Sequence, residues 1–162
     1  MANALAVIDD TATAPGTNKL QYHEFVTLRL DNQLFGISVM AVQDVMRRQR
    51  IAPIPLAASV IAGSLNVRGR IVTALNMRKL LGMKDYPEPE KIMKVVIEYQ
   101  HELYALIVDA VGDVLSLPVK QLEKVPANLD ASWRVLASHV SKLENELLII
   151  LDVAHVVERI TE

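Results

Sequence analysis

The fold is decided by the stretch VTLRLDNQLFGISVMAVQDVM, residues 26–46, and by its partial copy VVIEYQHELYALIVDAVGDVL, residues 95–115. The two stretches align without a gap. Seven of the 21 aligned positions are identical: Val26/Val95, Leu34/Leu103, Val39/Val108, Ala41/Ala110, Val42/Val111, Asp44/Asp113 and Val45/Val114. Chance would match roughly one or two positions in such a composition. The chain therefore contains two related halves.

The repeat extends further along each half. RIVTALNMRKLL, residues 70–81, lies against ELLIILDVAHVV, residues 146–157, with a match mostly of pattern. A break falls at residues 85–90, where two prolines and three acidic residues disfavour burial. This predicts one subdomain over about 21–84, a linker over 85–90 and a second subdomain over 91–160.

Each half is predicted to be made of short strands. The first strand alternates, with Val26, Leu28 and Leu30 on the face that we expect to be buried. Polar residues at 31–33, and at 100–102 in the second half, predict hairpin turns. No strand is followed by the long helical pattern of a βαβ unit. The fold class is therefore all-β with short helices.

Two further local signals follow in the first half. Arg68 and Gly69 predict a tight hairpin turn, with Gly69 at a positive φ. Residues 77–81 predict a short helix that Gly82 ends. A half of this size has a small core and exposed sheet edges, so we expect each half to curl into a barrel and the two to pack together. A groove between them would be a docking place.

Composition excludes several classes of protein. The 162 residues are 51% hydrophobic but only 4% aromatic, without cysteine and with a net charge of −2. No apolar run reaches the roughly 18 residues that cross a bilayer, and residues 1–20 read as a polar tail rather than a signal peptide. We therefore expect a cytoplasmic protein without membrane insertion, disulfides or a general attraction to nucleic acid.

Catalytic and metal-binding patterns are weak. The four histidines lack metal-ligand spacing, and no nucleotide-binding or nucleophile motif occurs. Asp109 and Asp113, with His101, could serve a small hydrolase as paired carboxylates. However, Asp113 has a counterpart in Asp44, which shared architecture explains better than an active site. We expect no enzymatic activity, no metal and no cofactor.

Clustered arginines leave a second alternative open. Arg47, Arg48 and Arg50 could bind single-stranded nucleic acid, although protection of an edge strand by charge explains them as well. Arg68 differs because a guanidinium held at a tight turn can reach the carboxylates or carbonyls of a partner in a fork geometry.

Three stretches resemble the CheW family of bacterial chemotaxis coupling proteins: IAGSLNVRGRIVTALNMRKLLG (61–82), YALIVDAVGDVLSL (104–117) and LLIILDVAHVV (147–157). The resemblance covers about residues 22–160. It implies two tandem, five-stranded, SH3-like barrels related by a pseudo-twofold axis. It also implies a non-enzymatic adaptor that links the cytoplasmic tips of chemoreceptors to the regulatory domain of the histidine kinase CheA.

Carried over by position, the resemblance implies a receptor-binding surface made by Val42, Asp44, Gly63, Asn66, Val67, Arg68 and Gly69. The kinase would contact outer faces of the barrels, with no residues assigned. Val67, Thr73 and Asn76 depart from the usual Leu, Pro and Asp of the family. A coupling protein of a parallel chemosensory pathway is therefore an alternative.

Overall fold

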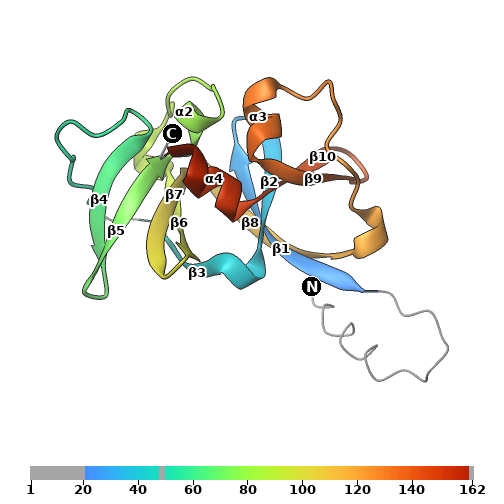
Figure 1. The fold of residues 1–162 in the computed structure, drawn as a ribbon, viewed down its shortest axis with the longest axis horizontal. Coiled ribbons are helices and arrows are strands. Elements are labelled where there is room, and N and C mark those ends of the chain that lie inside the picture. The colour runs from blue at the N-terminus through green and yellow to red at the C-terminus, as the bar shows by residue number, and fades with distance from the viewer. Residues whose placement is uncertain (1–20, 48–49, 161–162) are drawn as a thin grey trace.

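A computed structural model describes residues 21–47 and 50–160 and shows two five-stranded sheets that form two lobes side by side (Figure 1). The first sheet has the order β8-β1-β2-β10-β9, with strands β1 (Tyr22–Leu30), β2 (Gln33–Ser38), β8 (Ala110–Pro118), β9 (Ala137–Lys142) and β10 (Leu147–Leu151). The second has the order β3-β6-β7-β5-β4, with strands β3 (Val42–Met46), β4 (Ile61–Val67), β5 (Arg70–Asn76), β6 (Met93–Tyr99) and β7 (Glu102–Val108). The predicted mostly-β class is confirmed.

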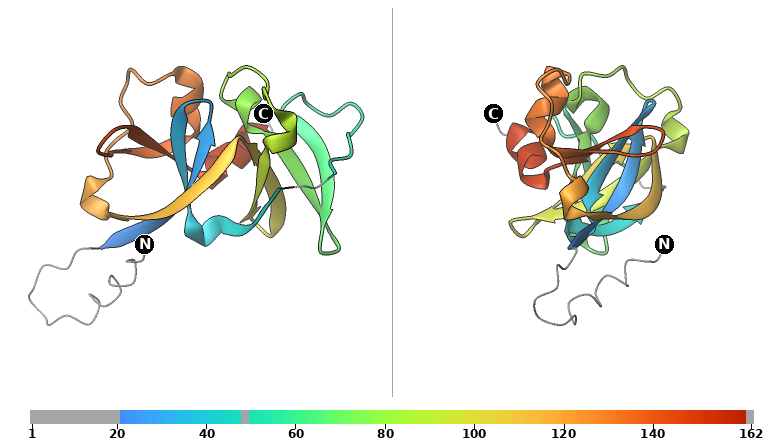
Figure 2. Two further views of the ribbon diagram at one scale, coloured as in Figure 1. Left: turned by 180° about the vertical axis from the view of Figure 1, so that it is seen from behind. Right: turned by 90° about the vertical axis from the view of Figure 1, so that its right-hand side faces the viewer.

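The two sheets do not coincide with the two halves of the sequence. The β1–β2 hairpin of the first half pairs with β8 and β10 of the second half, and the β6–β7 hairpin pairs with β3 and β5 of the first. The tandem division into 21–84 and 91–160 is therefore wrong for the sheets. Each half instead exchanges its first hairpin with the other, and β3 crosses between the lobes (Figure 2).

The internal repeat is preserved in the finer details of the sheets. β3 is bulged between Val42 and Asp44, and β8 carries the matching register shift where it pairs with β1. Each sheet is also closed by one antiparallel bridge from an edge strand to the segment that follows the opposite edge strand: Ser64 of β4 pairs with Ala52 after β3, and Val140 of β9 pairs with Glu123 after β8. Two backbone hydrogen bonds of 2.7–3.0 Å make each bridge. This closure makes each sheet a small barrel, as predicted.

The predicted turns are observed. Strands β1 and β2 are joined through Asp31, which has φ 61°, and β6 and β7 through Gln100 and His101 at φ 52° and 67°. The predicted short helix is α2 (Met77–Leu80), and Gly82 follows it at φ 71°. The Asn76 side chain accepts the Lys79 amide, so Asn replaces the usual Asp here as an equally good N-cap.

The core is divided into three clusters of buried side chains. The largest contains residues of both sheets, among them Leu28, Phe35 and Ile97, each 0% exposed, and joins the lobes. Two smaller clusters each belong to one sheet. The predicted buried face of β1 is confirmed, but Thr27 on the opposite face is also buried, and its hydroxyl donates to the Asp113 carbonyl at 2.6 Å. The strand is covered on both sides.

Helices of the second half fasten the lobes together. In α3 (Ala131–Leu136), the Trp133 indole donates to the Leu81 carbonyl of the other lobe at 2.9 Å and meets Phe35 edge-on. The helix α4 (Val153–Ile160) leaves the first sheet and lies against β6 of the second, where Tyr99 donates to Glu158 at 2.8 Å (Figure 1). The remaining 3-10 turns are Val39–Ala41, Pro89–Lys91 and Val119–Gln121.

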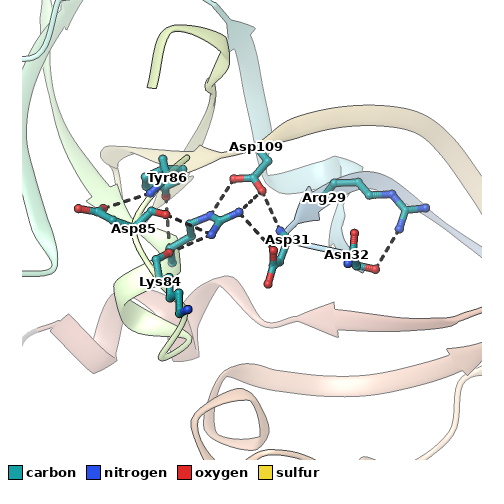
Figure 3. A network of polar contacts seen from close by, with 8 residues as sticks. Arg29, Asp31, Asn32, Lys84, Asp85, Tyr86 and Asp109 are labelled. Atoms are coloured by element: carbon teal, nitrogen blue, oxygen red, sulfur yellow. Dashed lines mark hydrogen bonds and ion pairs between the residues drawn. The ribbon is translucent and has the colours of Figure 1, made fainter. Parts of the chain in front are cut away.

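An ion pair with a buried guanidinium and a half-buried carboxylate lies at the contact between the lobes. The Arg78 side chain, 4% exposed, binds both carboxylate oxygens of Asp109 at 3.0 and 2.5 Å (Figure 3). The same carboxylate accepts the Asp31 backbone amide at 2.7 Å, so the β1–β2 turn of one lobe is tied to the other. Hydrogen bonding to Asp109 raises the pKa of Arg78 above its ordinary value, and the guanidinium stays charged.

The segment predicted to be a linker is held in place by the same arginine. Arg78 donates to the carbonyls of Lys84 and Asp85 at 2.9 and 3.3 Å. The ring of Tyr86 lies against the guanidinium, 5.3 Å from its carbon, and its hydroxyl donates to the Ile107 carbonyl. Burial raises the Tyr86 pKa, so this phenol remains a donor. Residues 84–86 are therefore anchored to the lobes, while residues 87–90 are exposed. The predicted tail, residues 1–20, lies outside the described residues.

We expect Arg78→Met to lower the free energy of unfolding by about 3–5 kcal/mol, because it leaves the Asp109 carboxylate without its counter-charge. Urea denaturation followed by circular dichroism measures this. The matched control is Lys79→Met on the exposed side of the same helix, which should change stability by less than about 0.5 kcal/mol. Equal effects of the two changes would contradict a clamping role for the pair.

Candidate docking surface

The predicted turn at Arg68 and Gly69 joins β4 to β5, with Val67 opposite Arg70. Both turn residues have positive φ, 51° for Arg68 and 85° for Gly69, the pattern of a type I′ turn. Glycine adopts this conformation freely, but an arginine there is strained. The Asn66 side chain steadies the turn by accepting the Gly69 amide at 2.9 Å.

The strained turn places Arg68 across the seam of the barrel. Its guanidinium forms an ion pair of 3.0 Å with Asp44 on β3, at the opposite edge of the sheet from β4. The Arg68 side chain is 78% exposed and that of Asp44 26%. The Val45 backbone amide also donates a hydrogen bond to the Asp44 carboxylate at 2.8 Å. An exposed pair of this kind adds little stability, so its value lies in the charge that it presents.

The other predicted site residues divide into two groups. Val42 is half-buried on β3, and Asn66 and Gly69 are exposed around the turn. Gly63 and Val67 are buried, which does not fit direct contact with a partner. A β-carbon on Gly63 would collide with the Ala52 carbonyl, and its φ is 150°. Gly63 therefore permits the bridge that closes the barrel and supports the surface from beneath.

An apolar residue that sequence reasoning missed lies beside the charged pair. Ile71 on β5 is 71% exposed and stands opposite Asn66 in the hairpin register. The alternation of the two strands could have revealed Ile71. Leu65, Val67 and Val72 are buried and point inward, so Ile71, next to Val72, must point outward. Val45, which is 38% exposed, follows Asp44 on β3 and so points to the opposite face of that strand. The surface around the turn thus combines charge with one exposed apolar group, Ile71, and mixed composition of this kind is typical of protein interfaces.

The residues of the alternative hydrolase do not converge. Both Asp109 oxygens are engaged by Arg78, while Asp113 is exposed on β8 and uses its backbone carbonyl to accept from Thr27. His101 and Asp109 flank opposite ends of the seven-residue strand β7, which is itself about 20 Å long. Among the described residues no group of three His, Asp or Glu side chains is arranged to hold a metal ion.

The clustered arginines that the structure describes are not accompanied by an aromatic platform for bases. Arg47 and Arg50 are exposed, and Arg48 lies outside the described residues. Arg29 is bound to Glu146 through two hydrogen bonds of 2.9 and 2.7 Å, and Trp133 is half-buried against Phe35. The described residues around these cations therefore offer no exposed Trp on which bases of a single strand could stack. No described helix is long and apolar enough to cross a membrane.

The chain forms two barrels that exchange hairpins, and one barrel carries an exposed charged pair. No catalytic groups converge among the described residues. These features define a docking module. A family model described as a CheW-like domain matches residues 24–161. The chain belongs to the CheW family of chemotaxis scaffolding proteins, which are non-enzymatic adaptors.

Individual relatives agree with this assignment. The chain is 24% identical to the chemotaxis protein CheW of Bacillus subtilis over 136 residues, covering 84% of this chain and 87% of that protein. It is 25% identical to the protein of the same name from Thermotoga maritima over 143 residues, covering 88% and 92%. The crystal structure of the scaffolding protein TtCheW from Thermoanaerobacter tengcongensis superposes with a TM-score of 0.73 at 23% identity, covering 80% and 88%. This likeness supports the fold.

Gly63→Ala is expected to destabilise the protein by about 2 kcal/mol or more, because the added methyl group displaces the closing bridge at Ala52. The control is Gly69→Ala, where φ is also positive but nothing lies within 4 Å of the new carbon, so about 1 kcal/mol is expected. Thermal unfolding of both variants gives the comparison. A smaller loss at Gly63 than at Gly69 would remove Gly63 from the closure of the barrel.

Proposed function

We propose that the protein couples the cytoplasmic tips of chemoreceptors to the histidine kinase CheA, and that it is recruited from the cytoplasm to receptor arrays at the membrane. The receptor-binding surface in this proposal is the one around the β4–β5 turn. Val42, Asp44, Asn66, Arg68 and Gly69 would contact the receptor, while Gly63 and Val67 support them.

The ion pair between Arg68 and Asp44 is the observation that carries this proposal. Its two residues come from separate segments, β3 and the β4–β5 turn, and the family resemblance assigns both of them to one surface. Backbone strain at an exposed arginine is costly and persists where the surrounding structure holds it, commonly at functional sites. A carboxylate on a receptor helix could share the Arg68 guanidinium, which offers more donors than Asp44 uses.

Coupling by such a module depends on multivalency. One surface holds a receptor hairpin and another holds the kinase, so the kinase reaches a high effective concentration at the receptor although each contact is weak. The rigid contact between the lobes, fastened by Arg78 and Trp133, would keep the two docking surfaces in a constant relative orientation. A shift in the receptor would then bias the arrangement of the kinase.

Arg68→Glu is expected to leave the fold intact, because the side chain is mostly exposed, and to weaken receptor recruitment by at least about 2 kcal/mol, or roughly thirtyfold in Kd. Co-sedimentation with receptor-bearing membranes, at concentrations near the Kd, measures it. The control is Lys120→Glu on the other lobe. The exchange Asp44→Arg with Arg68→Asp restores the pair but should not restore recruitment; full rescue would show that Arg68 acts only through Asp44.

Arg68→Asn separates binding from stability. Asn tolerates positive φ, and Asn-Gly is a favoured type I′ turn, so the free energy of unfolding should stay equal or rise by up to about 1 kcal/mol. Receptor recruitment should fall, because the guanidinium is lost. Urea denaturation and co-sedimentation of the same preparation report both quantities. Undiminished recruitment by this variant would exclude Arg68 from the receptor contact.

A further inference from the structure

A second charged feature lies at the open end of the β3–β7 barrel. A shallow pocket of about 700 Å³ is lined by Arg47, Arg50, Lys91 and Lys94, and Glu90 is the acidic residue among the described residues of its lining. Lys91 is paired with Glu88 at 3.3 Å, so Arg47, Arg50 and Lys94 against Glu90 leave an excess of about +2 in a chain whose net charge is −2. A concave surface with an excess of positive charge concentrates its field, so this pocket attracts anions that the whole protein would repel.

Lys94 distinguishes this pocket from an ordinary solvated basic patch. The residue is 3% exposed, and its ammonium donates to the Arg47 carbonyl at 3.2 Å. It forms no ion pair with any acidic residue in the described part of the chain. Burial lowers the pKa of Lys94, because the charged form has lost water without gaining a counter-charge. An ammonium has three donors, and two remain for a ligand.

The internal repeat shows that the fold does not require these cations. The corresponding end of the other barrel has a pocket of about 590 Å³, lined by His23, Phe25 and Val119 among others. In the repeat alignment Lys94 occupies the position of Phe25, and Ile92 that of His23. Arg50 and Val119 come from the corresponding segments after β3 and β8. Equivalent positions in the two lobes therefore hold the buried ring of Phe25 in one lobe and the buried cation of Lys94 in the other.

We propose that this basic pocket is a second docking site, which takes the carboxylate side chains of an acidic segment on a partner protein. Lys94 supplies the central charge, and Arg47 and Arg50 at the rim can bind a carboxylate through two parallel hydrogen bonds. Neither rim guanidinium forms an ion pair with another described residue. The pocket is open, so it suits a side chain presented by a surface. This inference extends the adaptor role proposed above to a site distinct from the Arg68 turn.

The probe for this site is a fluorescently labelled hexaglutamate peptide, with hexaglutamine as its neutral counterpart, followed by anisotropy on the full chain. The wild type should bind hexaglutamate and not hexaglutamine. Arg47→Gln with Arg50→Gln should weaken binding about five- to tenfold, and Lys94→Met, which keeps the length of the stem, at least about tenfold. The matched control, Lys120→Gln with Lys124→Gln, removes the same two charges outside the pocket and should leave the affinity within twofold.

Several outcomes would overturn the proposal. Equal losses of hexaglutamate affinity in the pocket and control variants would show that net charge alone causes the binding. Displacement of the peptide by inorganic phosphate at similar concentrations would show that the pocket binds a free anion. Tighter binding of an oligodeoxythymidine than of hexaglutamate would identify a nucleic-acid surface. If Lys94→Met fails to fold, the Arg47 and Arg50 variants still decide the matter. No receptor or kinase is present, so a negative result leaves the proposed coupling function untouched.

Discussion

Each barrel is completed by strands from both halves of the chain, because each first hairpin pairs with strands of the opposite half. Strand β2 lies parallel to β10, and β7 lies parallel to β5, so each barrel needs both halves of the chain. Neither barrel can close before the other half is present. We therefore expect the two lobes to unfold together, with the largest hydrophobic cluster shared between them. A scaffold built in this way holds its surfaces at a constant separation.

The polar contact between the lobes makes this arrangement unique. A hydrophobic interface alone could tolerate some sliding, whereas a buried guanidinium and a half-buried carboxylate must meet in one geometry. Arg78 also engages the backbone of residues 84 and 85, so the connection between the halves is fixed by the same side chain. Packing supplies most of the free energy, and Arg78 with Asp109 selects one relative position of the two barrels.

The two lobes share a backbone but differ in the chemistry that they present. Asp44 has a counterpart in Asp113, yet the turn corresponding to Arg68, residues 143–146, reads LENE and offers no cation. The charged pair therefore forms on one lobe alone, and the same lobe carries the basic pocket around Lys94. Divergence of side chains on a repeated framework has produced an asymmetric surface, which an adaptor needs in order to distinguish its partners.

Local signals in the sequence determined the strands, the turns at Asp31, Arg68 and Gln100, and the helix that Gly82 ends, because each depends on neighbouring residues and on positive φ. The internal repeat likewise predicted two similar barrels. The pairing of the strands became known from the three-dimensional fold, because the two first hairpins are alike in sequence and either half could accept either one. For the same reason the fold alone brought Asp44 to Arg68 and Asp109 to Arg78, since long-range contacts follow from strand exchange and closure, which no local pattern records.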